Sequence, residues 1–137
     1  MFNNHKRLLI DISRDRVWIR FFYLKKDKQK PLSSGCSRID NFYDYNGTIC
    51  DAPSLAVNIH ILIKTNKINS GRSEGIKAII VYHSDRDSDT ELSEQTIEDM
   101  AKLLMITPVC ITDYGPSVLD TEITPEEVYD RFLNDRL

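Results

Sequence analysis

The strongest constraint on the fold is residues 7–24, in which two apolar runs are separated by a very short turn at residues 13–15. Two parallel strands need a crossover of about a dozen residues or more, so runs this close must pair as an antiparallel hairpin. Asp11 is therefore expected near the rim of a sheet, beside the turn. That position suits a carboxylate that handles phosphate or metal. It equally suits an acid that pairs with Arg14 or Arg16, and this structural interpretation is the one favoured.

Two segments have the pattern of buried strands. Apolar residues fill almost every position of 8–12 and of 76–82, which is typical of strands covered on both faces. The lysine-rich run 25–31 and the serines and glycine that follow predict an exposed loop through residue 35. A third strand is predicted at 37–45, turned back by Asn46 and Gly47.

Residues 54–66 are ambiguous between helix and strand, because their apolar positions alternate strictly and also form a helical stripe. Asp51 and Pro53 are typical of a helix start. A buried strand at 76–82 that lies parallel to the first strand needs a crossover, and a helix from Pro53 to about Lys67 supplies it. We therefore predict a helix.

The remaining elements follow from capping signals. Ser88 and Glu91 form a predicted capping box for a helix ending near Met105, followed by a short strand at 108–112. Thr124–Glu127 is a second capping box, with a last helix running to about residue 133.

The length of 137 residues predicts a single domain over 1–137 that can bury a substantial core. Three widely spaced cysteines indicate neither a disulfide framework nor a zinc site. The N-terminus lacks the features of a signal peptide, and no apolar run approaches the ~18 residues of a membrane span. A cytoplasmic domain is expected, with a membrane segment conceivable only beyond Leu137.

The charge is strongly polarised along the chain. Residues 1–30 hold nine Lys and Arg against three acids, whereas residues 84–137 hold fourteen acids against four bases. Such polarity can steer docking to charged partner surfaces, although solvated surface charge explains it equally well, and the acidic half argues against bound nucleic acid. The predicted partner-binding residues are Lys25, Lys26, Lys28, Lys30, Glu91, Glu94 and Glu98.

The order strand, strand, strand, helix, strand, helix, strand, helix resembles the ribonuclease H-like fold. That fold includes actin-like ATPases, resolvase-type nucleases, and cytoplasmic domains of the inner-membrane platforms of type IV pili and type II secretion systems. The expected architecture is thus α/β, with a mixed five-stranded sheet. Residues 9–13, Leu-Ile-Asp-Ile-Ser, and the hairpin after them are similar to the first phosphate loop of actin-like proteins.

The departures from this motif lead to a non-catalytic prediction. Ser13, Arg14 and Asp15 stand where a phosphate loop has glycine and small residues, and a carboxylate there opposes an anion. The resemblance then implies a scaffold domain of a pilus or secretion platform. It would lie at the inner membrane, dock the assembly ATPase and neighbouring platform proteins, possess no cofactor and perform no catalysis, and it could form homo-oligomers.

Two alternatives stay open. A resolvase-like nuclease would gather Asp11, Asp85 and Asp113 around Mg²⁺ at one sheet edge, although the acids near residue 85 also suit a polar loop that caps the next helix. A degenerate nucleotide-binding domain is the other alternative. The three histidines, His5, His60 and His83, have no metal-ligand spacing and are predicted to be surface or packing residues.

Overall fold

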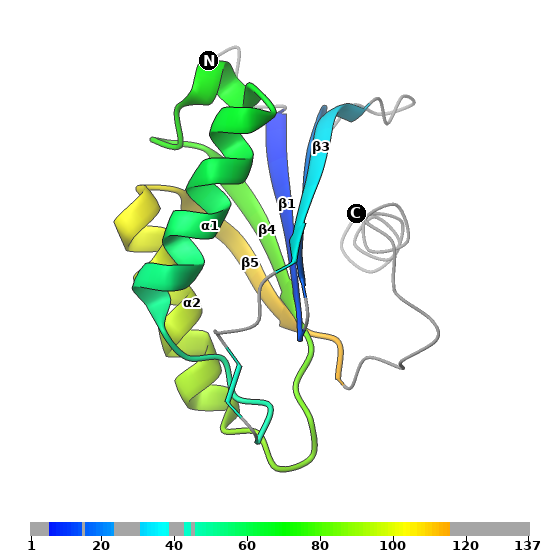
Figure 1. The fold of residues 1–137 in the computed structure, drawn as a ribbon, viewed down its shortest axis with the longest axis vertical. Coiled ribbons are helices and arrows are strands. Elements are labelled where there is room, and N and C mark those ends of the chain that lie inside the picture. Colours follow the sequence, from blue (N-terminus) through cyan, green and yellow to red (C-terminus); the bar gives the residue numbers. More distant parts are fainter. Residues whose placement is uncertain (1–5, 15, 24–30, 39–42, 45, 116–137) are drawn as a thin grey trace.

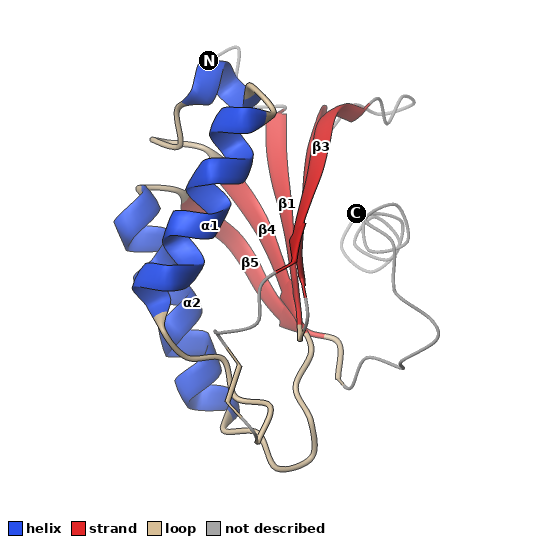
Figure 2. Cartoon of the chain, viewed as in Figure 1, coloured by secondary structure: helices blue, strands red, loops and turns tan. Residues whose placement is uncertain are grey.

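The computed structural model describes residues 6–14, 16–23, 31–38, 43–44 and 46–115, and for 22–23 and 31–38 it describes the backbone alone. An α/β sandwich is formed by one sheet with two helices packed on one of its faces (Figures 1 and 2). The elements are β1 Lys6–Ser13, β2 Arg16–Tyr23, β3 Pro31–Arg38, α1 Ala52–Thr65, the short 3-10 helix η2 Ile68–Gly71, β4 Lys77–Tyr82, α2 Thr90–Leu104 and β5 Thr107–Asp113.

The strands form a mixed sheet in the order β3-β2-β1-β4-β5. β2 pairs antiparallel with both β1 and β3, whereas β4 lies parallel to β1 and to β5. The hairpin and the parallel crossovers have the predicted directions, so the α/β class with a mixed sheet is confirmed. In the parallel pair, Asp11 lies beside Val81. The carboxyl ends of β1, β4 and β5 therefore meet at one edge of the sheet.

The loop predicted through residue 35 is wrong. Of the third strand predicted at 37–45, residues 37–38 belong to β3, and residues 39–42 and 45 lie outside the described residues. β3 spans Pro31–Arg38 and includes the serines and glycine that were predicted to form a loop. This segment has little apolar character, and its extended form comes from hydrogen bonding along β2, in which Cys36 lies opposite Trp18. Proline at the first residue of an edge strand leaves no ladder donor missing. Tyr43 forms an isolated β-bridge with Ile49.

The helix predicted from Pro53 to about Lys67 is confirmed as α1, which ends at Thr65 with Asn66 as its C-cap. The helix begins after Asp51, whose side chain accepts from the backbone N–H of Ser54, with Pro53 in the first turn. The buried positions of α1 are Leu55, Ala56, Ile59, Leu62 and Ile63. These buried residues repeat at three and four positions, as one helical face requires, whereas Val57 and Ile61 of the alternating pattern are exposed.

α2 has a different N-cap from the predicted one. Asp89, not Ser88, accepts from the N–H of Leu92, and the helix runs from Thr90 to Leu104. Ser88 instead donates its hydroxyl to the carbonyl of Gly47, 2.9 Å away, and accepts from the N–H of Asp85. The serine therefore joins two loops, and the neighbouring aspartate is left to cap the helix.

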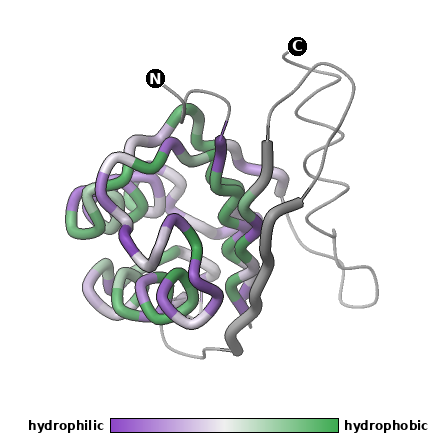
Figure 3. The backbone as a smooth tube through the Cα atoms, turned by 90° about the horizontal axis from the view of Figure 1, so that it is seen from above, coloured by the Kyte–Doolittle hydropathy of each residue, from purple (hydrophilic) through white to green (hydrophobic). Residues whose placement is uncertain are grey.

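The core lies between the sheet and the helices. Leu8, Ile10 and Ile12 of β1 are fully buried there against apolar residues of α1 and α2. Leu9, Ile79 and Val81, which alternate with them onto the other face, are only 1% exposed. Both faces of the central strands are thus buried, as their sequences predict. Figure 3 shows the hydrophobic strands and the inward helix faces along this layer.

Some predictions lie outside the described residues. They are the lysine loop at 25–30 and the last helix, at 124–133. Among the helices that the structure does describe, none has the length and apolar character needed to cross a bilayer.

Candidate functional site

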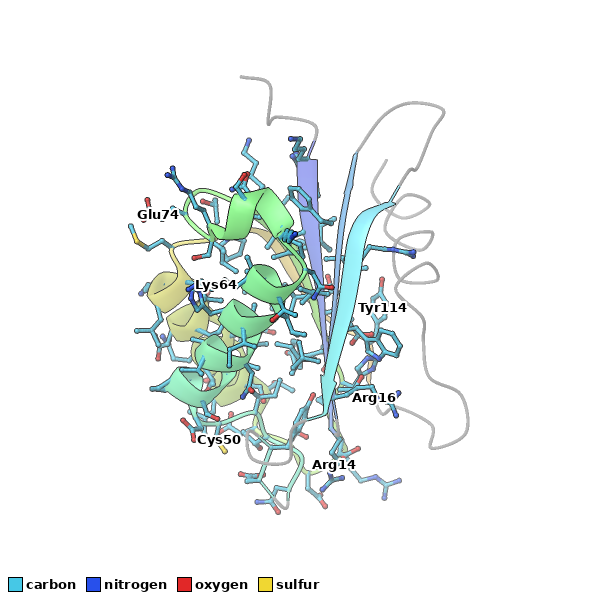
Figure 4. All side chains as sticks on the ribbon, turned by 45° about the horizontal axis from the view of Figure 1, so that its top comes forward. Arg14, Arg16, Cys50, Lys64, Glu74 and Tyr114 are labelled. Atoms are coloured by element: carbon cyan, nitrogen blue, oxygen red, sulfur yellow. The ribbon has the colours of Figure 1, made fainter. Side chains whose placement is uncertain are left out.

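Polar residues gather at the carboxyl edge of β1, β4 and β5, in the lower part of Figure 1. They come from the β1–β2 turn, the β4–α2 loop, the end of β5 and the loop at 43–50. In open α/β sheets this is the edge where ligands bind, because the loops after the strands leave a crevice there. In Figure 4, Arg14 lies at this end of the sheet, and Tyr114 lies on the side away from the helices.

A buried aspartate–histidine pair forms the inner part of this edge. The Nε2 atom of His83 lies 2.9 Å from Oδ1 of Asp11, and the two side chains are 3% and 1% exposed. Burial lowers the pKa of His83, but the hydrogen bond and charge of Asp11, with help from Gly115 and Asp113, outweigh it and leave that pKa raised. The pair therefore holds a proton more firmly than a free histidine does.

A second cluster joins the ends of β4 and β5. Both the N–H and the hydroxyl of Ser84 donate to the carboxylate of Asp113, and the N–H of Gly115 donates to the same group at 2.8 Å. Partial burial raises the pKa of Asp113, but the hydrogen bonds from Ser84 and Gly115 outweigh that effect and lower it. Asp113 is thus stabilised as an anion, and it is exposed at the end of β5.

The outermost pair is Arg14 with Asp85. An Nη1 atom of Arg14, in the β1–β2 turn, lies 2.8 Å from Oδ2 of Asp85, in the β4–α2 loop. The two side chains are 54% and 39% exposed. An ion pair this open to water contributes at most about 1 kcal/mol to stability, so an anionic ligand can compete with Asp85 for the guanidinium at little cost.

The loop at 43–50 fixes the position of Asp85. Gly47 has a positive φ of 83°, and a Cβ at this position would lie 2.6 Å from Oδ2 of Asp85. The turn is closed by Asp44, whose side chain accepts from the N–H groups of Asn46 and Thr48. Glycine is needed here both for the left-handed backbone and for the close approach of the acid.

Tyr43 stands among the three acids of this edge. Its hydroxyl donates to the carbonyl of Ile12 at 2.6 Å. Burial is the main cause of its raised pKa, and the charges of Asp11, Asp113 and Asp85 add to the effect. The phenol thus stays protonated at any ordinary pH, and it acts as a hydrogen-bond donor rather than a base.

The structure brings the predicted nuclease acids to one edge but gives each a different partner. Asp11 is paired with His83 and its Oδ2 is buried, Asp113 is bound by Ser84, and Asp85 is paired with Arg14. Among the described residues there is no group of three side chains that could hold a metal ion. This arrangement does not fit the paired Mg²⁺ ions that the nuclease alternative requires.

The sequence prediction that an arginine neighbour holds Asp11 is wrong. Arg14 reaches Asp85, and Arg16 lies over the ring of Trp18, 5.8 Å from its centroid. His83 was missed as the partner. The available signal was the parallel register, because a histidine two residues after Val81 falls on the same face of the sheet as Asp11.

The predicted partner-binding residues are only partly described. The four lysines lie outside the described residues, whereas Glu91, Glu94 and Glu98 are exposed on α2. Glu94 accepts the hydroxyl of Tyr82 at 2.8 Å, so one of these acids already takes part in internal packing.

No family model matches the sequence, and no curated protein matches it. Solved structures do match the fold. The Ppx/GppA enzyme of Aquifex aeolicus has a TM-score of 0.53 at 10% identity, with 80% of this chain and 36% of that chain covered. A second Aquifex aeolicus structure, a type II variant of a Ppx/GppA phosphatase, has a TM-score of 0.52 at 11% identity, covering 81% and 36%. An exopolyphosphatase from Cytophaga hutchinsonii has a TM-score of 0.50 at 13% identity, covering 79% and 34%.

This likeness corrects the prediction that the domain is not an enzyme, because these neighbours are phosphatases, and it lends no support to a pilus or secretion platform. The chain spans about a third of the length of these proteins. At 10% to 13% identity the likeness establishes the fold. The α/β domain therefore shares its fold with part of these Ppx/GppA and exopolyphosphatase structures.

Proposed function

We propose that this chain supplies one wall of a phosphoryl-transfer site that hydrolyses phosphoanhydride bonds. The observation that carries the proposal is the exposed Arg14–Asp85 pair, which bridges two loops at the ligand-binding edge of a fold found in phosphatases. An arginine fork matches phosphate oxygens in geometry and charge. A phosphate that binds the guanidinium displaces the carboxylate, which can then accept a hydrogen bond from a water molecule.

The reaction follows from these two groups. The phosphoryl group binds the guanidinium of Arg14 in place of Asp85. The freed carboxylate of Asp85 orients a water molecule and accepts its proton. The water oxygen forms the new bond to phosphorus, and the phosphoanhydride P–O bond breaks with its electron pair on the leaving phosphate. Phosphoryl transfer depends mainly on positioning and on charge stabilisation, which suits a site of this simplicity.

The charge of the described wall supports a site in two parts. Its exposed groups include three acids, Asp85, Asp87 and Asp113, against the two cations Arg14 and Arg86. Such a wall activates water well but attracts a polyanion poorly. Further cationic groups would come from outside the described residues.

The substrate class is proposed from the neighbours. One of them is called an exopolyphosphatase, and a chain of phosphates offers a terminal phosphoryl group with little else to recognise. An exposed arginine with a nearby carboxylate offers the charge and the hydrogen-bond donors that such a terminus needs.

The test measures release of inorganic phosphate from linear polyphosphate and from ATP. Asp85→Asn keeps the shape of the acid but removes its basicity, so release should fall by about 10²-fold or more. The control is Arg72→Gln, which changes an exposed arginine distant in sequence from the edge and should leave release unchanged. Equal release by wild type and Asp85→Asn, or no release from either substrate by wild type, overturns the proposal.

A further inference from the structure

Three segments that are far apart in sequence meet at the ring of His83. Its Nε2 atom faces Oδ1 of Asp11 at 2.9 Å, and its Nδ1 atom faces the carbonyl oxygen of Gly115 at 3.2 Å. A carboxylate and a carbonyl can only accept hydrogen bonds. Both ring nitrogens therefore donate, and the buried ring has two protons in this arrangement. We propose that His83 is the positioning residue of the phosphoryl-transfer edge, tying β1, β4 and the segment after β5 together from both ring nitrogens.

The hydrogen bond between His83 and Asp11 is the more important of the two, because few other groups compensate the buried charge of this carboxylate. Its Oδ2 atom is buried and has no hydrogen-bond partner within the described part of the chain. A buried carboxylate without compensation is costly, so the imidazolium provides the charge that makes this aspartate tolerable. A divalent cation performs that role in the nuclease alternative, and here a side chain of the protein performs it.

Through its hydrogen bond with Gly115, His83 also restrains the position of the exposed Asp113. Gly115 accepts from His83 and donates its own N–H to Asp113, while Ser84, the residue after His83, donates twice to the same carboxylate. The N–H of Tyr114 also donates to the carbonyl of Tyr82 at 2.9 Å. These bonds close a ring between the ends of β4 and β5, and His83 closes it on the buried side.

The other described groups around the ring agree with a fixed cation. Tyr114 meets His83 edge-on, with ring centroids 6.4 Å apart and planes at 77°. The charge of Asp113 favours the protonated ring, as does that of Asp11. Arg14 is held by Asp85 at the outer end of the edge. The inference rests on the proposed function, since the edge that His83 organises is the proposed phosphoryl-transfer wall.

The first test needs no variant. In ¹⁵N-labelled protein at pH 7, an ordinary histidine of pKa about 6.5 is mostly neutral. We expect the ring of His83 to show two protonated nitrogens at this pH, with protons that exchange slowly. The exposed His60 of α1 is the internal control, and any ring proton there should exchange rapidly with water. A neutral His83 ring with one proton at pH 7 overturns the proposal.

The second test is chemical rescue of His83→Gly. Loss of buried hydrogen bonds to a charged donor should speed amide exchange at Tyr114 and Gly115 by about tenfold or more. Added imidazole should restore protection. 1-Methylimidazole should restore less, because its methylated nitrogen cannot donate and its other nitrogen donates only when it is protonated. Exchange within about twofold of wild type, or equal rescue by both compounds, contradicts a tether with two donors.

The two proposals fail in different ways. Ring protonation and amide exchange need no substrate, so an inactive protein with both signatures leaves the tether intact and overturns the phosphatase. An active protein with a neutral His83 ring overturns the tether and leaves the phosphatase intact. Where activity is present, imidazole should also restore kcat to His83→Gly with little change in KM, because the ring positions groups and does not touch the substrate.

Discussion

The imidazole of His83 and the carboxylate of Asp11 lie 2.9 Å apart, although 72 positions separate them in the sequence. They lie at the ends of two neighbouring parallel strands and are almost wholly buried. The pair therefore couples the stability of the central sheet to the arrangement of its carboxyl edge. A change in either residue should affect both.

Asp11→Asn tests the energetic side of this pair. The amide has the shape of the carboxylate but leaves a buried imidazolium without its counter-charge, so we expect a loss of about 3 kcal/mol in the free energy of unfolding at pH 6. Urea denaturation followed by circular dichroism measures it. The control is Asp87→Asn, an exposed acid of the adjacent loop, which should cost under about 0.5 kcal/mol. Similar losses in the two variants would show that the buried pair is not special.

The stability of the domain should also depend on pH through His83. The pKa of this residue is raised from 6.5 on folding, so its contribution is fully present below about pH 6.5. That contribution is lost as the pH rises through the pKa of the folded state. The difference in unfolding free energy between wild type and His83→Gln should therefore shrink as the pH rises from about 6.5 into the alkaline range. A difference that is constant across this range contradicts a histidine protonated by folding.

Gly47→Ala tests how closely the loop at 43–50 packs on Asp85. A Cβ would meet Oδ2 of Asp85 at 2.6 Å, and the positive φ of 83° adds backbone strain. Gly75→Ala is a matched control, because Gly75 has a φ of 75° but nothing within 4 Å of the added carbon. Both changes should lower the free energy of unfolding by about 1–2 kcal/mol because of backbone strain. Gly47→Ala should cost about 1–3 kcal/mol more for the steric clash. Equal losses would mean that the loop yields freely.

Ser93→Ala should destabilise the attachment of the same loop to α2. Ser93 is fully buried, and its Oγ accepts from the N–H of Ile49 at 2.9 Å. Removing the acceptor leaves a buried N–H unsatisfied, which costs about 1–3 kcal/mol. Thr96→Val is the comparison, since the Thr96 hydroxyl donates to a carbonyl within its own helix. The valine variant should lose about 0.5 kcal/mol or less, and thermal unfolding ranks the two.

The elements that the sequence predicts correctly are those formed by their own patterns. Apolar runs identify β1 and β4 in this way. The pattern of α1 leaves helix and strand open, and the crossover that the parallel strands need decides for the helix. β3 could not be predicted in this way, because Pro-Leu-Ser-Ser-Gly-Cys-Ser-Arg has almost no apolar periodicity and becomes a strand by pairing with β2. Its conformation is therefore set by a partner outside the segment.

The site shows the same division. Strand-end aspartates at residues 11, 85 and 113 could be placed at one edge from the order of elements alone. Their partners could not, because each pairing depends on register and loop packing. Arg14, three residues from Asp11, reaches across to Asp85, and His83 takes Asp11 instead.

The most direct test of the central claim is an NMR titration of the chain with tripolyphosphate. The account predicts saturable shifts at the Arg14 side chain and in the backbone amides of residues 83–88 and 113–115, which line the carboxyl edge. It predicts no shift at the opposite end of the sheet, where Lys6 and Lys77 line a small pocket with Gly75. Shifts confined to those lysines, or none at the carboxyl edge at any concentration, would contradict it.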